Sequence, residues 1–257
     1  NNPNLQNIPI RTKKGREIRK AFITLNSDFV LLAADYSQIE LRIMASFSKD
    51  KSMMEAFRLG KDIHATTASK VFGVPLEQVD TDMRRKAKEV NFGIIYGMSA
   101  FGLSQNLNIS RSEAAEIIEA YWKEFPSVRS YMDECIAKAK EQGYVETIFG
   151  RRLWLPEIKA SGPRRQGAER AAINAPMQGT AADLIKLAMV AVQDWLEREK
   201  LRTRMLLQVH DELVFEAAPD ELEHLKSSLP GLMGSIAQLK VPLIVSIGVG
   251  DNWEEAH

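Results

Sequence analysis

The alternation of apolar and polar positions predicts strands at both ends of the chain. An apolar run over residues 30–34 ends in Asp35-Tyr36-Ser37, which predicts a buried strand with polar groups at its C-terminal end. Two further apolar runs, 205–209 and 213–217, flank His210-Asp211-Glu212. They predict a β-hairpin with the polar triplet at its bend.

Helical periodicity fills the middle of the chain. Gly60, Gly73 and Gly143 are stop signals, Ser110 with Glu113 forms a capping box, and Pro176 with Gly179 predicts a break between two helices. The predicted helices cover residues 52–59, 62–72, 82–96 (with Thr81 or Asp82 as N-cap), 110–125, a segment ending at 142, 164–175, 181–200 and 219–229. A strand or hairpin over 144–156, around Gly150, and a last strand over 241–249 complete an α+β fold: an antiparallel sheet with a large helical insertion.

Composition excludes several classes of protein. The 257 residues are 45% hydrophobic and 26% charged, which is typical of a soluble globular chain and not of a disordered, collagen-like or disulfide-rich one. No apolar run approaches the roughly 18 residues that a bilayer span needs. The single Cys135 cannot form an intrachain disulfide, which fits a reducing cytoplasm.

Charge is balanced in total but not along the chain. The 34 Lys and Arg residues equal the 34 Asp and Glu residues. Residues 11–20 nevertheless carry six basic side chains and one acid, and residues 151–170 carry six basic side chains and two acids. A neutral total can therefore include a basic face, although a solvated surface of mixed charge explains the counts equally well.

Two aspartates stand at the ends of predicted strands. Asp35 and Asp211 each follow an apolar run, and brought together they would repel each other at neutral pH. Divalent cations resolve such repulsion, and oxygen ligands without clustered Cys or His favour Mg²⁺ or Mn²⁺. Spacing alone leaves open the alternative that each aspartate only caps a turn.

A second group of residues recurs every four positions. Arg84, Lys88, Phe92 and Tyr96 lie on one slowly turning stripe of the predicted helix. Cations near a helix N-terminus suit a polyphosphate, and the aromatic rings beyond them suit a sugar and a base. A surface helix with two buried aromatic residues is the competing interpretation.

Several motifs together resemble family A DNA polymerases of the bacterial DNA polymerase I type. They are PNLQNIPIRT (3–12), DYSQIELR (35–42), DIH (62–64), RRKAKEVNFGIIYG (84–97), GYVETIFGRRLWLP (143–156), QGTAAD (178–183) and VHDE (209–212). They occur in the family's order and span nearly the whole chain. The resemblance implies a palm over residues 1–47 and 176–257 and fingers over residues 48–175.

The resemblance also implies a nucleotidyl transfer from dNTPs to a primer 3′-hydroxyl. Asp35, Asp211 and the backbone carbonyl of Tyr36 would hold two Mg²⁺ ions, with Mn²⁺ as an alternative, and Glu212 would assist. Arg84, Lys88 and His64 would bind the triphosphate, and Lys88 is also the candidate acid for the pyrophosphate.

By the same resemblance, further residues would select the incoming nucleotide and contact the DNA. Phe92 would face the sugar, Glu40 with Tyr96 would exclude a ribose 2′-hydroxyl, and Tyr36 and Gln38 belong to the nucleotide site. Primer, template and minor groove would be contacted by Asn7, Arg11, Arg170, Asn174, Gln178 and His210.

The expected partners are primer-template DNA and a dNTP, without a membrane. The family's thumb and its Thr-Gly-Arg motif normally precede PNLQN and are not in this sequence. We therefore expect a monomeric palm-and-fingers part of a longer bacterial polymerase, associated with the nucleoid, with upstream thumb and nuclease domains. The alternatives are a non-catalytic primer-template or nucleotide-binding module and a metal-dependent nuclease; the stripe argues against a nuclease, which needs no triphosphate clamp.

Overall fold

The computed structural model describes residues 4–8 and 12–257. These residues form two compact units, each considered by itself below. The sheet unit comprises Asn1–Ile39, Ala181–Gln238 and Leu243–His257, and the helical unit comprises Glu40–Thr180 and Leu239–Pro242. In the described part of the chain, no helix has the length and hydropathy that crossing a membrane requires.

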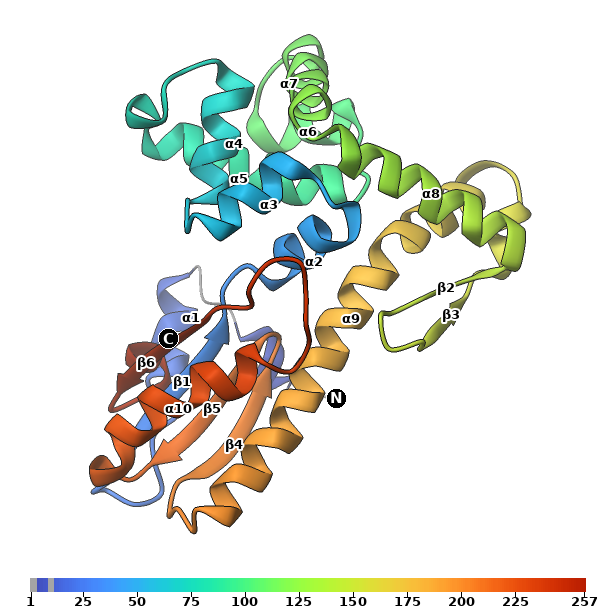
Figure 1. Cartoon of the computed structure of the whole chain (residues 1–257). Helices are drawn as coiled ribbons and strands as arrows, with labels where there is room; N and C mark the ends of the chain where they lie inside the picture. The colour runs from blue at the N-terminus through green and yellow to red at the C-terminus, as the bar shows by residue number, and fades with distance from the viewer. Residues whose placement is uncertain (1–3, 9–11) are drawn as a thin grey trace. The chain divides into compact units, whose positions relative to one another are not determined.

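The sheet unit is built on four antiparallel strands in the order β4-β5-β1-β6 (Figure 1). The strands are β1 (Val30–Tyr36), β4 (Arg204–Val209), β5 (Glu212–Ala217) and β6 (Val245–Gly250). Every residue of the central strand β5 is buried, which explains its nearly continuous apolar sequence. The predicted α+β fold with an antiparallel sheet is confirmed.

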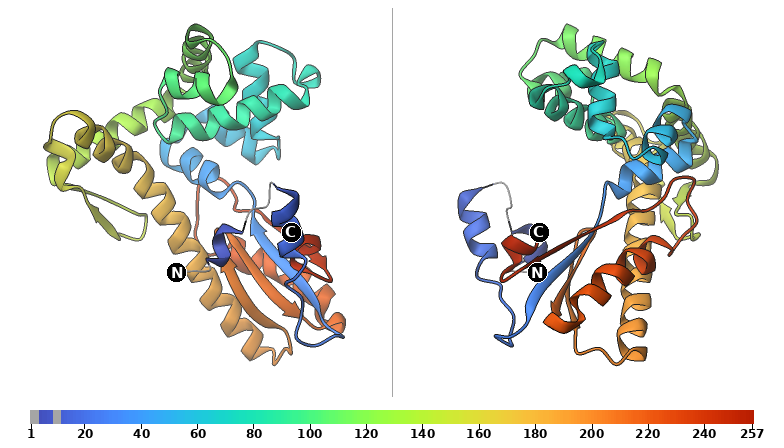
Figure 2. Two further views of the ribbon diagram at one scale, coloured as in Figure 1. Left: turned by 180° about the vertical axis from the view of Figure 1, so that it is seen from behind. Right: turned by 60° about the vertical axis from the view of Figure 1, so that its left-hand side comes forward.

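Helices cover both faces of this sheet (Figure 2). Leu31 and Ala33 of β1 pack with Trp253 of α11 on one face, whereas Tyr36 of the same strand reaches the other face and donates a hydrogen bond to the Met233 carbonyl of α10. This is the two-residue alternation of a strand. The helical elements of the unit are η1 (Leu5–Asn7), α1 (Lys13–Arg19), η4 (Pro219–Glu221), α10 (Leu222–Gly234), α11 (Trp253–Ala256) and the C-terminal part of α9 (Gly162–Arg198).

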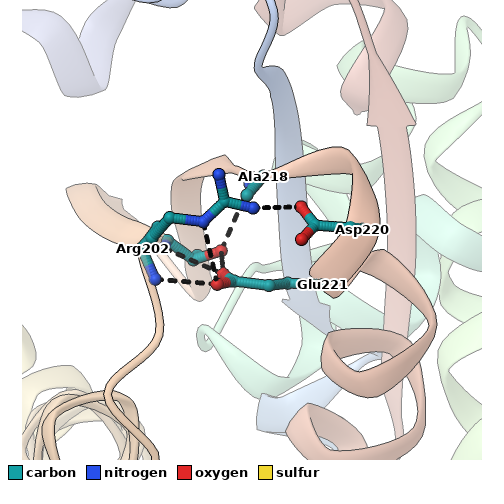
Figure 3. Close-up of polar contacts among 5 residues, drawn as sticks. Arg202, Ala218, Asp220 and Glu221 are labelled. Atoms are coloured by element: carbon teal, nitrogen blue, oxygen red, sulfur yellow. Dashed lines mark hydrogen bonds and ion pairs between the residues drawn. The ribbon is translucent and has the colours of Figure 1, made fainter.

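A cluster of hydrogen bonds and ion pairs joins the start of β4 to the end of β5, at the open end of this hairpin (Figure 3). The Glu221 carboxylate accepts hydrogen bonds from the backbone N–H groups of Arg202, at 2.8 Å, and Thr203, at 3.0 Å. The Thr203 hydroxyl donates to the same carboxylate and accepts from the Ala218 N–H, and the Arg202 guanidinium pairs with Asp220. Residues that precede β4 are thereby tied to residues that follow β5, so the opposite end of the hairpin, at Asp211, projects from a fixed base.

The helical unit consists of a helical array, the first part of α9 and one short hairpin. The hairpin pairs β2 (Tyr144–Glu146) with β3 (Arg152–Trp154) and packs with α8 and α9 around Val145, Ala139 and Ala172. The other elements are α2 (Ile39–Ser48), α3 (Lys51–Arg58), α4 (Ile63–Phe72), η2 (Leu76–Gln78), α5 (Thr81–Ile95), α6 (Ala100–Leu107), α7 (Arg111–Glu124), α8 (Pro126–Gln142) and η3 (Pro156–Lys159).

The predicted break at Pro176 and Gly179 is wrong. Residues 162–198 form the single 37-residue helix α9 with Pro176 inside it. A proline in a helix interior costs about 3 kcal/mol. Burial of Ala172, Ile173, Met177 and Thr180 on both sides of the proline outweighs this local cost.

Other predicted boundaries shift by a few residues. The N-cap of α5 is Asp80, which accepts from the Met83 N–H, and not Thr81 or Asp82. Strand β6 begins at Val245 and not at residue 241. The predicted helix 219–229 begins as the 3₁₀ turn η4 and continues in α10 to Gly234, while the Ser110–Glu113 capping box is confirmed.

Candidate active site

Strand pairing brings Asp35 and Asp211 to the same end of the sheet. Asp35, near the end of β1, lies opposite Glu212, the first residue of β5, in the antiparallel register. The N–H of the next β1 residue, Tyr36, donates to the Asp211 carbonyl at 3.2 Å. Asp35 and Asp211, which are separated by 175 residues of sequence, thus lie next to each other, Asp35 near the end of β1 and Asp211 in the turn before β5.

Unusual backbone geometry accompanies both aspartates. His210 precedes Asp211 in the two-residue turn with φ +51°, and Gln38 follows the end of β1 with φ +55°. Non-glycine residues rarely occupy this left-handed region, and such positions cluster at functional sites. The His210 carbonyl accepts a hydrogen bond from the Gln208 side chain at 2.6 Å, which helps to hold the turn.

The electrostatics of this pair favour a bound cation. Burial, together with the negative charges of Asp211 and Glu212, raises the pKa of Asp35 to about 7. Burial and the Glu212 charge likewise raise the pKa of Asp211. A divalent cation between the two carboxylates would supply the missing positive charge, so these oxygen donors fit Mg²⁺ or Mn²⁺.

Glu212 is held differently from the two aspartates. Its side chain is buried; one oxygen accepts from the Trp253 indole N–H at 2.8 Å, and the other pairs with His257 Nδ1 at 2.5 Å. Both oxygens are therefore engaged by the C-terminal segment. In the described residues, no group of three or more His, Cys, Asp or Glu side chains forms a metal site, so the candidate site is a pair of carboxylates.

In the helical unit, α5 carries the predicted stripe as one aligned face. Arg84 and Lys88 are exposed near its N-terminal end, and the rings of Phe92 and Tyr96 stack with centroids 6.3 Å apart. His64 of α4 adds a third ring, 5.9 Å from Phe92. The structure therefore brings together five residues that the sequence predicted for a nucleotide site.

The cationic end of the stripe is anchored to α4. Arg84 Nε contacts Asp62 at 2.5 Å, and Asp62 also caps α4 by accepting from the His64 and Ala65 N–H groups. These interactions hold the pKa of Asp62 below its usual value despite partial burial. Arg84 and His64 are thereby fixed beside each other.

Glu40 and Tyr96 meet directly. The Tyr96 hydroxyl donates a hydrogen bond to the Glu40 carboxylate, joining the start of α2 to the end of α5. Gly97, with φ +73°, follows Tyr96, and a Cβ there would lie 3.0 Å from the Arg170 side chain of α9. The glycine allows α5 and α9 to approach at this point.

The predicted DNA contacts fall in three places. Arg170, Asn174 and Gln178 are four residues apart on the unbroken α9 and share one face of it. His210 lies exposed at the Asp211 turn and Asn7 lies exposed in η1, whereas Arg11 is outside the described residues. Tyr36 is buried with its hydroxyl bound to Met233, so only its backbone remains for the predicted ligand role.

Sequence reasoning missed four residues of these sites: Asp62, Asn91, Trp253 and His257. Asp62 stood in a recognised motif without a role of its own. Asn91 precedes Phe92 inside another motif, and its complete burial is the signal that a sequence does not display. Trp253 and His257 lie some 40 residues beyond Glu212 and meet it only through the fold.

Comparisons with known proteins agree with this architecture. DNA polymerase I of Pseudomonas aeruginosa is 57% identical over 256 residues, which are 99% of this chain and 28% of that protein. DNA polymerase I of Geobacillus stearothermophilus is 51% identical over 99% of the chain and 29% of its own length. The chain thus spans under a third of these relatives.

A solved structure is also similar: the POL domain of Pol1 from M. smegmatis in complex with DNA primer-template and dNTP. It matches with a TM-score of 0.95 and 47% identity, over 99% of this chain and 45% of that one. The family model described as DNA polymerase family A matches residues 1–255. With a match of this extent, the chain belongs to DNA polymerase family A.

Proposed function

We propose that this chain carries the nucleotidyl-transfer centre of a template-directed DNA polymerase. It would add deoxynucleotides from dNTPs to a primer 3′-hydroxyl and release pyrophosphate. The observation that carries the proposal is the pair Asp35 and Asp211, one near the end of β1 and the other in the turn that leads into the neighbouring β5, both with raised pKa values. Such a pair suits a bound divalent cation better than a purely structural role.

The sheet unit would be the palm and the helical unit the fingers. The proposed subdomains are 1–47 and 176–257 for the palm and 48–175 for the fingers. The compact units change over at residues 39–40 and 180–181, within eight residues of these boundaries, which supports the division. The main segment of the helical unit is inserted between two parts of the sheet unit, and its short second segment, Leu239–Pro242, falls within the proposed palm.

Asp35 and Asp211, with the Tyr36 carbonyl, would hold two Mg²⁺ ions. Bound there, the ions would supply positive charge that lowers the pKa of the primer hydroxyl and stabilises the triphosphate. Glu212, held by Trp253 and His257, would orient the start of β5 and with it the neighbouring Asp211. Mn²⁺ could replace Mg²⁺ because the ligands are all oxygen atoms.

The α5 stripe would bind the incoming nucleotide. Arg84, Lys88 and His64 would contact the triphosphate, and Lys88 would protonate the departing pyrophosphate. Phe92 would pack against the sugar, and Tyr36 and Gln38 would also contact the nucleotide, as their motif implies. The joined Glu40 and Tyr96 side chains would fill the space of a ribose 2′-hydroxyl, so that deoxynucleotides are selected.

Primer-template DNA would be contacted by residues of α9 and by residues of the Asp211 turn. Arg170, Asn174 and Gln178 present donors at helical spacing, and His210 and Asn7 add exposed polar side chains. Minor-groove acceptors are nearly the same for every base pair, so donors of this kind test the shape of a pair without reading its sequence. Arg11 is assigned to primer-template contact by its motif.

The test is a primer-extension assay with Mg²⁺ and all four dNTPs. It is run on the chain itself and on a chimera in which the chain replaces the matching segment of the Pseudomonas aeruginosa DNA polymerase I. We expect extension by the chimera and a loss of at least about 10³-fold in D211A, since loss of a metal-holding carboxylate removes several kcal/mol of transition-state stabilisation.

The matched control is D220A, which removes an exposed carboxylate of the same unit and should leave extension within about twofold. Duplex binding in EDTA by a chimera that never extends a primer would replace the proposal with a binding module. Release of mononucleotides without dNTPs by the chain itself, abolished in D211A, would replace it with a nuclease.

A further inference from the structure

Asn91 is a fully buried amide in the middle of α5. Its exposed fraction is 0%, and it lies between the apolar Val90 and Phe92. A buried amide is costly unless its polar atoms are paired. Its side-chain partners are two residues of α4, His64 and Thr67.

The two ends of the amide face different groups. Asn91 Oδ1 lies 3.1 Å from Thr67 Oγ1, and Asn91 Nδ2 lies 2.9 Å from His64 Nδ1. The single Thr67 hydroxyl proton has two acceptors within reach, Asn91 Oδ1 and the Ile63 carbonyl at 2.8 Å. An amide nitrogen only donates, so His64 Nδ1 must accept, and the imidazole proton then sits on Nε2.

The charges around His64 shift its pKa in opposite directions. Burial lowers the pKa of His64 to about 4, Asp62 favours the protonated ring, and Arg84 and Lys88 oppose it. His64 is 3% exposed, so little water compensates a charge on it. The ring is therefore neutral at physiological pH, in agreement with the donor that faces Nδ1.

We propose that Asn91 is a positioning residue that fixes His64 as a neutral ring with its proton on Nε2. This inference rests on the proposed function, because the Nε2–H would be the donor offered to a phosphate oxygen of the incoming nucleotide. Arg84 and Lys88 would then provide the positive charge, and His64 a directed hydrogen bond. A Thr67 hydroxyl proton directed at Asn91 Oδ1 would support this orientation of the amide.

The direct test is ¹⁵N NMR of histidine-labelled protein without nucleotide or metal. For the wild type we expect an unprotonated Nδ1 and a protonated Nε2 from pH 8 to pH 5. N91D replaces the donor with an acceptor, so we expect a proton on Nδ1 and a His64 pKa above that of the wild type. N91L removes the amide, so His64 Nδ1 should lose its hydrogen-bond partner. The control N106D makes the same amide-to-acid change at the exposed Asn106 of α6 and should leave the His64 signals unchanged.

The functional arm uses the polymerase chimera. N91L should raise the KM for dNTP about 5- to 10-fold, about the worth of one hydrogen bond, while kcat changes less than about threefold. N91D should make KM depend on pH near the new His64 pKa, a dependence that loss of stability alone would not produce. T67V should give a smaller KM increase than N91L.

The two arms separate this inference from the proposed function. A wild-type His64 with its proton on Nδ1, or the same tautomer in wild type and N91D, overturns the role of Asn91 whatever the polymerase activity. The expected tautomers with an unchanged KM in N91L overturn the link to the nucleotide. An inactive wild-type chimera overturns the proposed function and leaves the NMR result to decide the tautomer.

Discussion

Among single residues, Asp35 lies where its ionised carboxylate destabilises the folded protein. It is half-buried beside two other acidic side chains, and its pKa is raised to about 7. Above that pH the folded protein holds an ionised carboxylate at a cost that the unfolded chain, with a pKa near 3.8, does not have. A site built for a cation carries this cost when the cation is absent.

D35N should therefore stabilise the metal-free protein. Because the folded-state pKa of Asp35 is above the unfolded value, its destabilising effect is absent below about pH 4, grows as the pH rises, and is complete above about pH 7. We expect D35N to raise the free energy of unfolding by on the order of 2 kcal/mol at pH 8 in EDTA and by little at pH 4. Urea unfolding at both pH values measures this.

The comparison variant is D28N, which removes an exposed aspartate of the same unit. It should change the unfolding free energy by less than about 0.5 kcal/mol at either pH. If D35N destabilised the protein at pH 8, the carboxylate would be making a favourable contact that the observed register does not contain.

Among the elements, α9 has the largest effect on the candidate site. Arg170, Asn174 and Gln178 share a face only because the helix continues through Pro176. A break there would have turned Gln178 away from the other two. The continuity also places Gly179 against the hairpin, where a Cβ would lie 2.7 Å from Thr147 Cγ2.

Two glycines of α9 should respond to alanine in opposite directions. G179A should destabilise the protein by about 1–3 kcal/mol, since the buried β-branched Thr147 cannot easily move. A Cβ at Gly167 meets no atom within 4 Å, so G167A should stabilise by about 0.5–1 kcal/mol through helix propensity. Thermal unfolding of both variants checks this, and equal effects would contradict the close approach of the hairpin.

Local signals predicted local structure well. The Ser110–Glu113 capping box and the limits of α4 at Asp62 and Gly73 are confirmed, because a cap depends on neighbours a few residues away. Pro176 misled the prediction because the buried contacts that outweigh it lie on other elements. The same holds for Asn91: its partners are 24 and 27 residues away, so no local pattern reveals them.

For the whole molecule, the balance of charge hides a local excess. The net charge is zero, yet Lys13 and Lys14 stand exposed at the start of α1. Each phosphate contact by a lysine contributes about −0.9 to the slope of log affinity against log salt concentration. DNA binding should therefore weaken with salt despite the neutral total.

K13Q/K14Q in the chimera should make that slope shallower by about 1 to 2, the change expected when one or two lysine–phosphate contacts are lost. Fluorescence anisotropy with a labelled primer-template at several salt concentrations measures it. K226Q removes an exposed lysine that pairs with Glu223 and should leave the slope unchanged. Equal slopes in all three proteins would place the DNA away from α1.

The strand order β4-β5-β1-β6 has a consequence for synthesis of the chain. Strand β1 lies between two strands made much later, whereas residues 40–180 of the helical unit emerge as one continuous segment. At a translation rate of about 5–20 residues per second, β5 is synthesised roughly 10–35 s after β1, and during that time the apolar residues of β1 have no strand to pair with. Residues 40–180 of the helical unit are synthesised in that interval, while β1 stays an unpaired apolar strand that chaperones can bind.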